Sequence, residues 1–140
     1  MTAVLQIDAL PASWARGADP GWFRATGVPV KGAVWSRVRA FQPLERNPNY
    51  LLDRIGARRE GPLGRPEVAT LPEELADGVA VLAMELEPDD TLTARIDLVR
   101  RAWDLDILVS ARTSEIEATE ALASAMVELL GAVVPSGEPV

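Results

Sequence analysis

The chain has 140 residues, 48% of them hydrophobic and 25% charged, with a formal net charge of −7. This length and composition are typical of one globular domain and exclude intrinsic disorder. The sequence contains no His and no Cys, which excludes disulfides, thiolate metal sites, the usual general base near neutral pH and the thiol nucleophile. We therefore expect a protein that is not an enzyme and holds no cofactor.

The two halves of the chain carry opposite charge. Residues 1–66 hold ten basic and five acidic side chains, a net of +5, and residues 67–140 hold four basic and sixteen acidic side chains, a net of −12. A chain that is positive in one half and negative in the other can attract copies of itself head to tail, or a polar partner. We expect protein partners, either in a homo-oligomer or among the subunits of a particle.

The first 42 residues predict two strands and a long loop. Apolar and polar residues alternate over 4–10 and again over 34–42, which predicts a short strand in each segment. The segment between them, 11–33, contains three prolines and several glycines and is expected to be an extended loop. We interpret its large aromatic residues as loop anchors or interface residues. They are Trp14, Trp22 and Phe23.

The middle of the chain predicts small elements and no membrane segment. We expect a short helix over 48–55, a flexible basic arm over 56–66 and one helical turn within 70–75. The cations of the arm are Arg58, Arg59 and Arg65. The N-terminus lacks a basic signal-peptide region, and the longest apolar run is far too short to span a bilayer. We expect no membrane partner, and a location in the cytoplasm or in an assembled virion or particle.

The last half predicts strands followed by a helix. A continuous apolar run over 79–84, followed by alternation with Glu85 and Glu87, indicates a strand over 79–87, and alternation indicates strands over 92–98 and 103–111. The buried positions change from even to odd residue numbers between the last two strands, which predicts a bulge or tight bend near Arg100 and Arg101. A capping-box pattern then predicts a helix from about 115 to 130. The expected fold is α+β, an antiparallel sheet of about four to five strands with one long C-terminal helix packed on one face. We expect residues 1–134 to form a single domain and 135–140 to form a flexible tail.

Carboxylates are the main candidates for chemistry. Asp104 and Asp106 point the same way from one predicted strand, as do Glu85 and Glu87 from another. If those strands were neighbours, the four groups could bind a hard cation or support acid catalysis. We prefer the interpretation that they form the solvated polar face of the sheet.

The start of the predicted helix is also acidic. Glu115, Glu117, Glu120 and Glu128 form an acidic row along it, and the first of them fall in or near its first turn, where negative charge favours the helix dipole. They indicate a solvated helix face, or alternatively an acidic contact surface for an Arg-bearing neighbour.

Aromatic and basic residues alternate through 14–41, including Trp22, Trp35 and Arg37. Stacking combined with phosphate attraction is how proteins hold single-stranded nucleic acid. The strongly acidic chain opposes a polyanion, so we interpret these residues as loop anchors or as a protein interface. We do not expect nucleic acid as a partner.

Residues 91–133 combine a strand, a small polar turn and a helix rich in Ala and Glu. In this they resemble subunits of the tail-terminator and tail-completion families of tailed phages. The resemblance implies a non-enzymatic ring subunit whose polar loops reach its neighbours or line a channel. No functional residue is carried over from it.

Three functions follow from the sequence. The first is a structural or assembly subunit, most simply an oligomeric component of a phage-tail-like particle. The alternative is a small acidic binding module, such as an inhibitor, an immunity-type protein or a secretion chaperone, that masks a basic partner. The third is a small enzyme using carboxylates or a bound cation. The expected interface residues are Trp14, Trp22, Phe23, Arg58, Arg59, Arg65, Asp104, Asp106, Glu115, Glu117 and Glu120.

Overall fold

The structure, a computed structural model, describes residues 5–42, 66–75 and 78–135. Its strands are β1 (Leu5–Ile7), β2 (Trp14–Arg16), β3 (Trp22–Ala25), β4 (Trp35–Phe41), β5 (Glu67–Thr70), β6 (Gly78–Leu86), β7 (Leu92–Ala102), β8 (Leu105–Thr113) and β9 (Val133–Pro135). Its helices are the short 3₁₀ turns η1 (Glu73–Leu75) and η2 (Ile116–Ala118) and the α-helix α2 (Thr119–Ala132).

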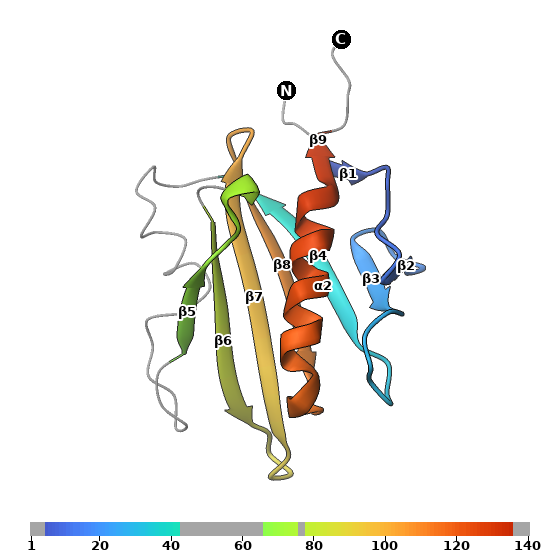
Figure 1. Cartoon of the computed structure of the whole chain (residues 1–140), viewed down its shortest axis with the longest axis vertical. Helices are drawn as coiled ribbons and strands as arrows, with labels where there is room; N and C mark the ends of the chain where they lie inside the picture. Colours follow the sequence, from blue (N-terminus) through green and yellow to red (C-terminus); the bar gives the residue numbers. More distant parts are fainter. Residues whose placement is uncertain (1–4, 43–65, 76–77, 136–140) are drawn as a thin grey trace.

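The strands form one large and one small antiparallel sheet. The large sheet has seven strands in the order β2-β3-β4-β8-β7-β6-β5, and β1 pairs with β9 in a separate two-stranded sheet. Helix α2 lies along one face of the large sheet, over β7 and β8 (Figure 1). The opposite face of the large sheet is therefore not covered by α2.

Three long strands, β6, β7 and β8, form the centre of the sheet through two hairpins. Successive side chains of a strand project from opposite faces, so every second side chain of these strands points toward the helix. The β7–β8 hairpin turns on two residues, Trp103 and Asp104, whose φ angles are +51° and +59°. Two positive φ angles are the geometry of a tight type I′ hairpin turn. The bend expected near Arg100 and Arg101 therefore lies two residues further along the chain.

The main core lies between α2 and the large sheet. Even-numbered residues of β7 and odd-numbered residues of β8 point at the helix and are buried with its inner face. These core residues include Ile96, Leu98, Ile107, Val109, Leu122, Met126 and Leu129. The expected capping box does not form; instead, Thr113 Oγ1 accepts the backbone N–H of Glu115 at 3.0 Å before the helix begins.

The expected fold class is wrong. The large sheet alone has seven strands instead of four to five, and α2 has 14 residues, so the described chain is mostly sheet. The missed strands have three or four residues each and are β2, β3, β5 and β9. Segments this short carry too few residues to show a period, and they become strands because a neighbouring strand pairs with them.

The segment expected to be a loop contributes two of these strands. Its glycines supply the turn of a hairpin: Gly21 lies between β2 and β3 with a φ of +84°, and a Cβ there would lie 2.9 Å from the Val38 carbonyl oxygen. Glycine adopts that conformation without steric cost. The composition that predicted an irregular loop thus allows a tight hairpin at the edge of the sheet.

Several expectations fall outside the described residues. They are the helix over 48–55, the arm with Arg58, Arg59 and Arg65, and the tail beyond residue 135. Across residues 5–42, 66–75 and 78–135, no helix has the length and apolar character needed to cross a bilayer.

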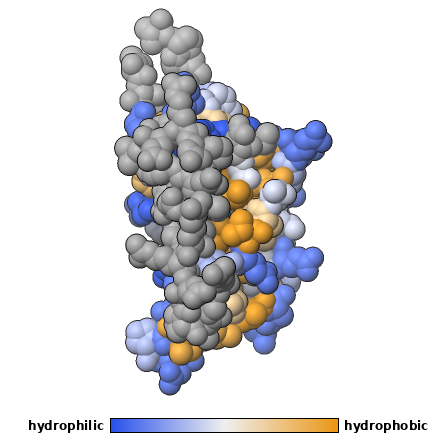
Figure 2. Space-filling view, turned by 90° about the vertical axis from the view of Figure 1, so that its left-hand side faces the viewer, coloured by the Kyte–Doolittle hydropathy of each residue, from blue (hydrophilic) through white to orange (hydrophobic). Residues whose placement is uncertain are grey.

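The face of the sheet opposite α2 has an apolar part of its own. Val81, Val99 and Leu108 are buried there, with Phe41 and Val79 packed against them. Figure 2 shows the side of the molecule that carries β5 and β6, where apolar surface lies among hydrophilic residues. Val68 of β5, which pairs with Val81 of β6, is half exposed on this face. Beyond the apolar part, the same face becomes strongly basic.

Candidate binding site on the sheet face opposite the helix

A pocket of about 590 Å³ lies on this face, over β3, β4, β8 and β7. Among the described residues, four arginines and one aspartate line it, a net charge of +3, although the whole chain carries −7. We call its cationic and aromatic lining the arginine face. It comprises Trp22, Trp35, Arg37, Arg39, Arg95 and Arg112.

Strand register brings these side chains together. Trp22 of β3 pairs with Arg37 of β4, which pairs with Ser110 of β8, which pairs with Asp97 of β7. Paired residues in an antiparallel sheet project from the same face. The guanidinium carbon of Arg37 lies 5.4 Å from the centre of the Trp22 ring, a cation–π contact that holds the arginine over the pocket.

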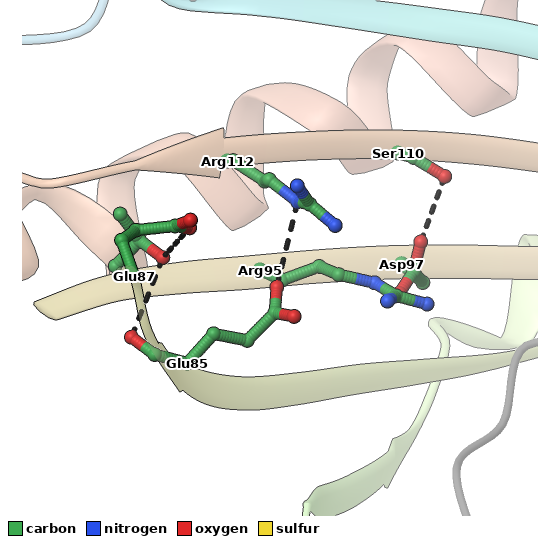
Figure 3. A network of polar contacts seen from close by, with 7 residues as sticks. Glu85, Glu87, Arg95, Asp97, Ser110 and Arg112 are labelled. Atoms are coloured by element: carbon green, nitrogen blue, oxygen red, sulfur yellow. Dashed lines mark hydrogen bonds and ion pairs between the residues drawn. The ribbon is translucent and has the colours of Figure 1, made fainter. Parts of the chain in front are cut away.

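Asp97 is the only carboxylate among the described residues that line the pocket, and it is 4% exposed. Ser110 Oγ donates a hydrogen bond to Asp97 Oδ1 at 2.7 Å, and Arg95 Nε donates to Oδ2 at 2.7 Å (Figure 3). A buried carboxylate is tolerated when charge and hydrogen bonds compensate it in this way. Asp97 therefore fixes Ser110 and Arg95 within the floor of the pocket.

A second acidic group borders the pocket. Arg112 Nε lies 3.4 Å from Glu85 Oε1, a loose ion pair without hydrogen-bond geometry (Figure 3). The Arg112 side chain is 58% exposed and that of Glu85 35%, although the Glu85 Oε1 atom itself is buried. The neighbouring Glu87 contacts Thr93 instead, because its Oε1 accepts a hydrogen bond from Thr93 Oγ1 at 3.0 Å. Exposed pairs of this kind contribute little energy, so the Arg112 guanidinium can turn toward another anion.

Arg37 and Arg39 have no carboxylate partner among the described residues. They project from the same face of β4, and the Arg39 guanidinium carbon lies 5.6 Å from the Phe41 ring centre. The Nε of Arg39 is buried and has no hydrogen-bond partner in the described part of the chain. A buried unpaired donor is costly, and an incoming oxygen acceptor would remove that cost.

The chemistry of the arginine face is that of anion binding. Guanidinium groups match carboxylates through paired, charge-assisted hydrogen bonds, and the tryptophans supply flat apolar contact area beside them. Within residues 5–42, 66–75 and 78–135, no three acidic side chains come close enough together to hold a metal ion. The four-carboxylate cluster is not formed, because β7 separates β6 from β8.

The predicted aromatic interface residues divide between the core and the pocket. Trp14 is 4% exposed, and its Nε1 donates to the Ala125 carbonyl oxygen of α2 at 2.8 Å. Phe23 is also buried in the main core. Trp22 lines the pocket, beside Trp35, which is 41% exposed. Only Trp22 of the three therefore belongs to the candidate site.

The predicted acidic interface residues do not form one surface. Asp106 is fully buried on β8 and accepts a hydrogen bond from Arg101 Nε at 2.8 Å. Asp104 lies in the β7–β8 turn, before β8, whereas Glu117 and Glu120 follow β8 at its other end. Nine residues of extended strand separate these ends by about 30 Å. An acidic module would need these groups on one patch, so we leave that alternative aside.

Glu115 joins the first half of the chain to the start of the helix. Its two carboxylate oxygens accept the backbone N–H groups of Lys31 at 2.7 Å and Gly32 at 3.2 Å. These hydrogen bonds favour the charged form and hold the pKa of Glu115 below its usual value. Glu115 therefore holds the β3–β4 connection next to the start of the helical segment.

We expect Glu115→Gln to lower the melting temperature at neutral pH, because an amide binds the two N–H groups less strongly than a carboxylate. A lowered folded-state pKa gives a contribution that is complete above the unfolded value and is lost as pH falls through the folded value. The difference from the wild type should therefore shrink below about pH 4.3, the ordinary glutamate value. Thermal melts across that range test this, with Glu128→Gln on α2 as the control; a difference that grows in acid would contradict it.

Sequence reasoning found part of the arginine face, because Trp22, Trp35 and Arg37 belong to the residues interpreted as loop anchors or as a protein interface. Trp35, Arg37 and Arg39 share one side of the strand predicted over 34–42, a signal that was available. Arg95 and Arg112 could not be assigned to the same site, because only the observed order β4-β8-β7 places them beside β4.

The comparisons with known proteins concern the fold. No family model and no curated protein matches this sequence. Among solved structures, the chain is similar to a crystal structure of a protein from Bacteroides thetaiotaomicron VPI-5482, with a TM-score of 0.55 and 10% sequence identity. The similarity covers 96% of this chain and 46% of that chain, so this chain spans less than half the length of that protein. At this identity the likeness describes the fold alone.

Proposed function

We propose that this protein is a non-enzymatic binding subunit of a protein assembly, and that its arginine face binds an acidic segment of a partner. The observation that carries this proposal is a pocket lined by four arginines and two tryptophans on an otherwise acidic chain. Arg and Trp are the side chains most enriched where partners bind strongly, because they combine large contact area with directed polar groups.

An acidic protein segment fits this face better than a nucleic acid. The net charge of −7 repels a long polyanion, and Glu85 and Asp97 lie among the cations. A short acidic segment places a few carboxylates on Arg37, Arg39 and Arg112 without extending over the rest of the acidic surface. The particle-subunit hypothesis, including a phage-tail-like particle, remains the simplest setting for such a contact.

The test is fluorescence anisotropy of a labelled peptide of alternating Glu and Ala residues, titrated with the full chain at low and high salt. We expect saturable binding at low salt that weakens as salt is added, because the contact is electrostatic. Arg37→Gln should weaken binding about tenfold, the effect of losing one close ion pair.

The matched control is Lys31→Gln, which removes one positive charge from an exposed residue outside the pocket and keeps its backbone bond to Glu115. Equal losses in the two variants would show only a general charge effect and would overturn the proposal. Tighter binding of a thymidine oligonucleotide than of the acidic peptide would overturn it in favour of nucleic acid.

A further inference from the structure

The outer surface of η2 and α2 is an acidic stripe. Glu117, Glu120, Ser124 and Glu128 are exposed, and their spacing of three to four residues places them on one side of the helix. The segment Thr119–Ala132 contains no basic residue. Glu117, Glu120 and Glu128 have no ion-pair partner within the described part of the chain. We call these three glutamates and Ser124 the glutamate stripe.

The glutamate stripe and the arginine face lie on opposite sides of the molecule. The inner side of α2 packs on one face of the large sheet, so its outer side points away from that sheet (Figure 1). Arg95, Asp97, Ser110 and Arg112 project from the other face, with the helix behind the strands (Figure 3). The fold thus places the glutamate stripe and the arginine face on opposite sides, and it brings Arg95 and Arg112, from the acidic half of the chain, to the basic face.

The two surfaces also match in length. Arg39 pairs with Leu108, four residues before Arg112 on β8, so the cations extend over about 13 Å along the strands. The part of the stripe on α2 runs from Glu120 to Glu128, eight residues apart or about 12 Å along the helix axis, and Glu117 of η2 extends it by roughly 5 Å. Small residues, Ala121 and Ser124, lie between them and leave room for Trp22 and Trp35 to approach the helix.

We infer that the partner on the arginine face is a second copy of this chain, which presents its glutamate stripe. This rests on the proposed function and names the partner for the same site. The contact joins two different surfaces, so it is heterologous and repeats from copy to copy. The two surfaces lie on opposite sides of the molecule. A bound pair of copies therefore still has one free arginine face and one free glutamate stripe, to which further copies can bind.

The test uses two charge-reversed forms of the full chain. One carries Arg37→Glu and Arg112→Glu on the arginine face; the other carries Glu117→Arg and Glu120→Arg on the glutamate stripe. All four positions are exposed, and circular dichroism and melting temperature check that both forms fold. Each form alone should stay monomeric in light scattering, because its two contact surfaces then carry the same sign.

We expect wild-type mass to rise above the monomer with concentration at low salt and to fall back at high salt. Mixing the two reversed forms should restore the higher mass. One form then has two negative contact surfaces and the other two positive ones, so each surface finds a partner of opposite charge. A wild type that stays monomeric at every concentration overturns the inference, and so does a mixture that fails to reassemble while the wild type assembles.

Peptide titration separates this failure from failure of the proposed function. The Glu117→Arg, Glu120→Arg form keeps its arginine face and should bind the Glu–Ala peptide at least as tightly as the wild type does. If it binds the peptide while the wild type never self-associates, the acidic partner is another protein and only the second-copy inference falls. If it does not bind the peptide, the proposed function falls as well.

Discussion

Replacing Trp14 with alanine should lower the free energy of unfolding by about 3–5 kcal/mol, the range for deleting a buried aromatic side chain. Trp14 is 4% exposed and joins β2 to α2, because its indole Nε1 donates to the Ala125 carbonyl oxygen at 2.8 Å. Since domains are stable by about 5–15 kcal/mol, this loss would remove a large part of the total. Urea unfolding measures it.

Trp14→Phe is the milder substitution and should destabilise the fold less than Trp14→Ala does. It keeps an aromatic ring in the core and removes the indole N–H, so we expect a loss of about 1–2 kcal/mol from the missing hydrogen bond and the smaller ring. If Trp14→Ala stays within about 1 kcal/mol of the wild type, β2 is not anchored on α2 as described, and the placement of the first strands is wrong.

Arg101→Gln should cost about 3 kcal/mol, because it removes a positive charge from a buried ion pair. Arg101 Nε lies 2.8 Å from Asp106 Oδ1; the Asp106 side chain is fully buried and that of Arg101 is 19% exposed. Water cannot replace the guanidinium at such a site, so the carboxylate loses stabilisation that solvent does not return.

Arg112→Gln is the matched control, since it makes the same substitution on the same sheet face. Its partner Glu85 lies 3.4 Å away and both side chains reach solvent, so we expect a loss of about 1 kcal/mol or less. Urea unfolding of both variants measures the two losses. If Arg101→Gln and Arg112→Gln lower the free energy of unfolding equally, burial does not make the Arg101–Asp106 pair the more stabilising one. An apolar replacement of the whole pair, Arg101→Met with Asp106→Leu, should recover part of the stability lost in Arg101→Gln.

The sequence predicted elements wherever the local pattern was long enough. The strand that became β6 showed a six-residue apolar run, those that became β7 and β8 showed several alternations each, and a capping-box pattern marked the start of the helix. The strands β2, β3, β5 and β9 have three or four residues, and tertiary pairing decides their conformation. The sheet was therefore undercounted, and the glycines of 11–33 were interpreted as a loop although Gly21 forms a hairpin turn.

The candidate site was only partly within reach of the sequence. Trp35, Arg37 and Arg39 lie on one side of a single strand, so their common face was predictable. The charge division along the chain was less informative, because Arg95 and Arg112 come from the acidic half and join the cations of the basic half. Strand order, which no local pattern shows, decides which charges become neighbours.

The most direct test of the arginine face uses the four tryptophans as reporters. Trp22 and Trp35 line the pocket, Trp14 is buried in the main core, and Trp103 lies in the β7–β8 turn against Arg100. NMR spectra of the indole N–H groups, recorded while the Glu–Ala peptide is added, should show the Trp22 and Trp35 signals moving to saturation and the Trp14 and Trp103 signals staying in place. If the Trp103 signal moves instead, or if no indole signal moves, the arginine face is not the binding surface.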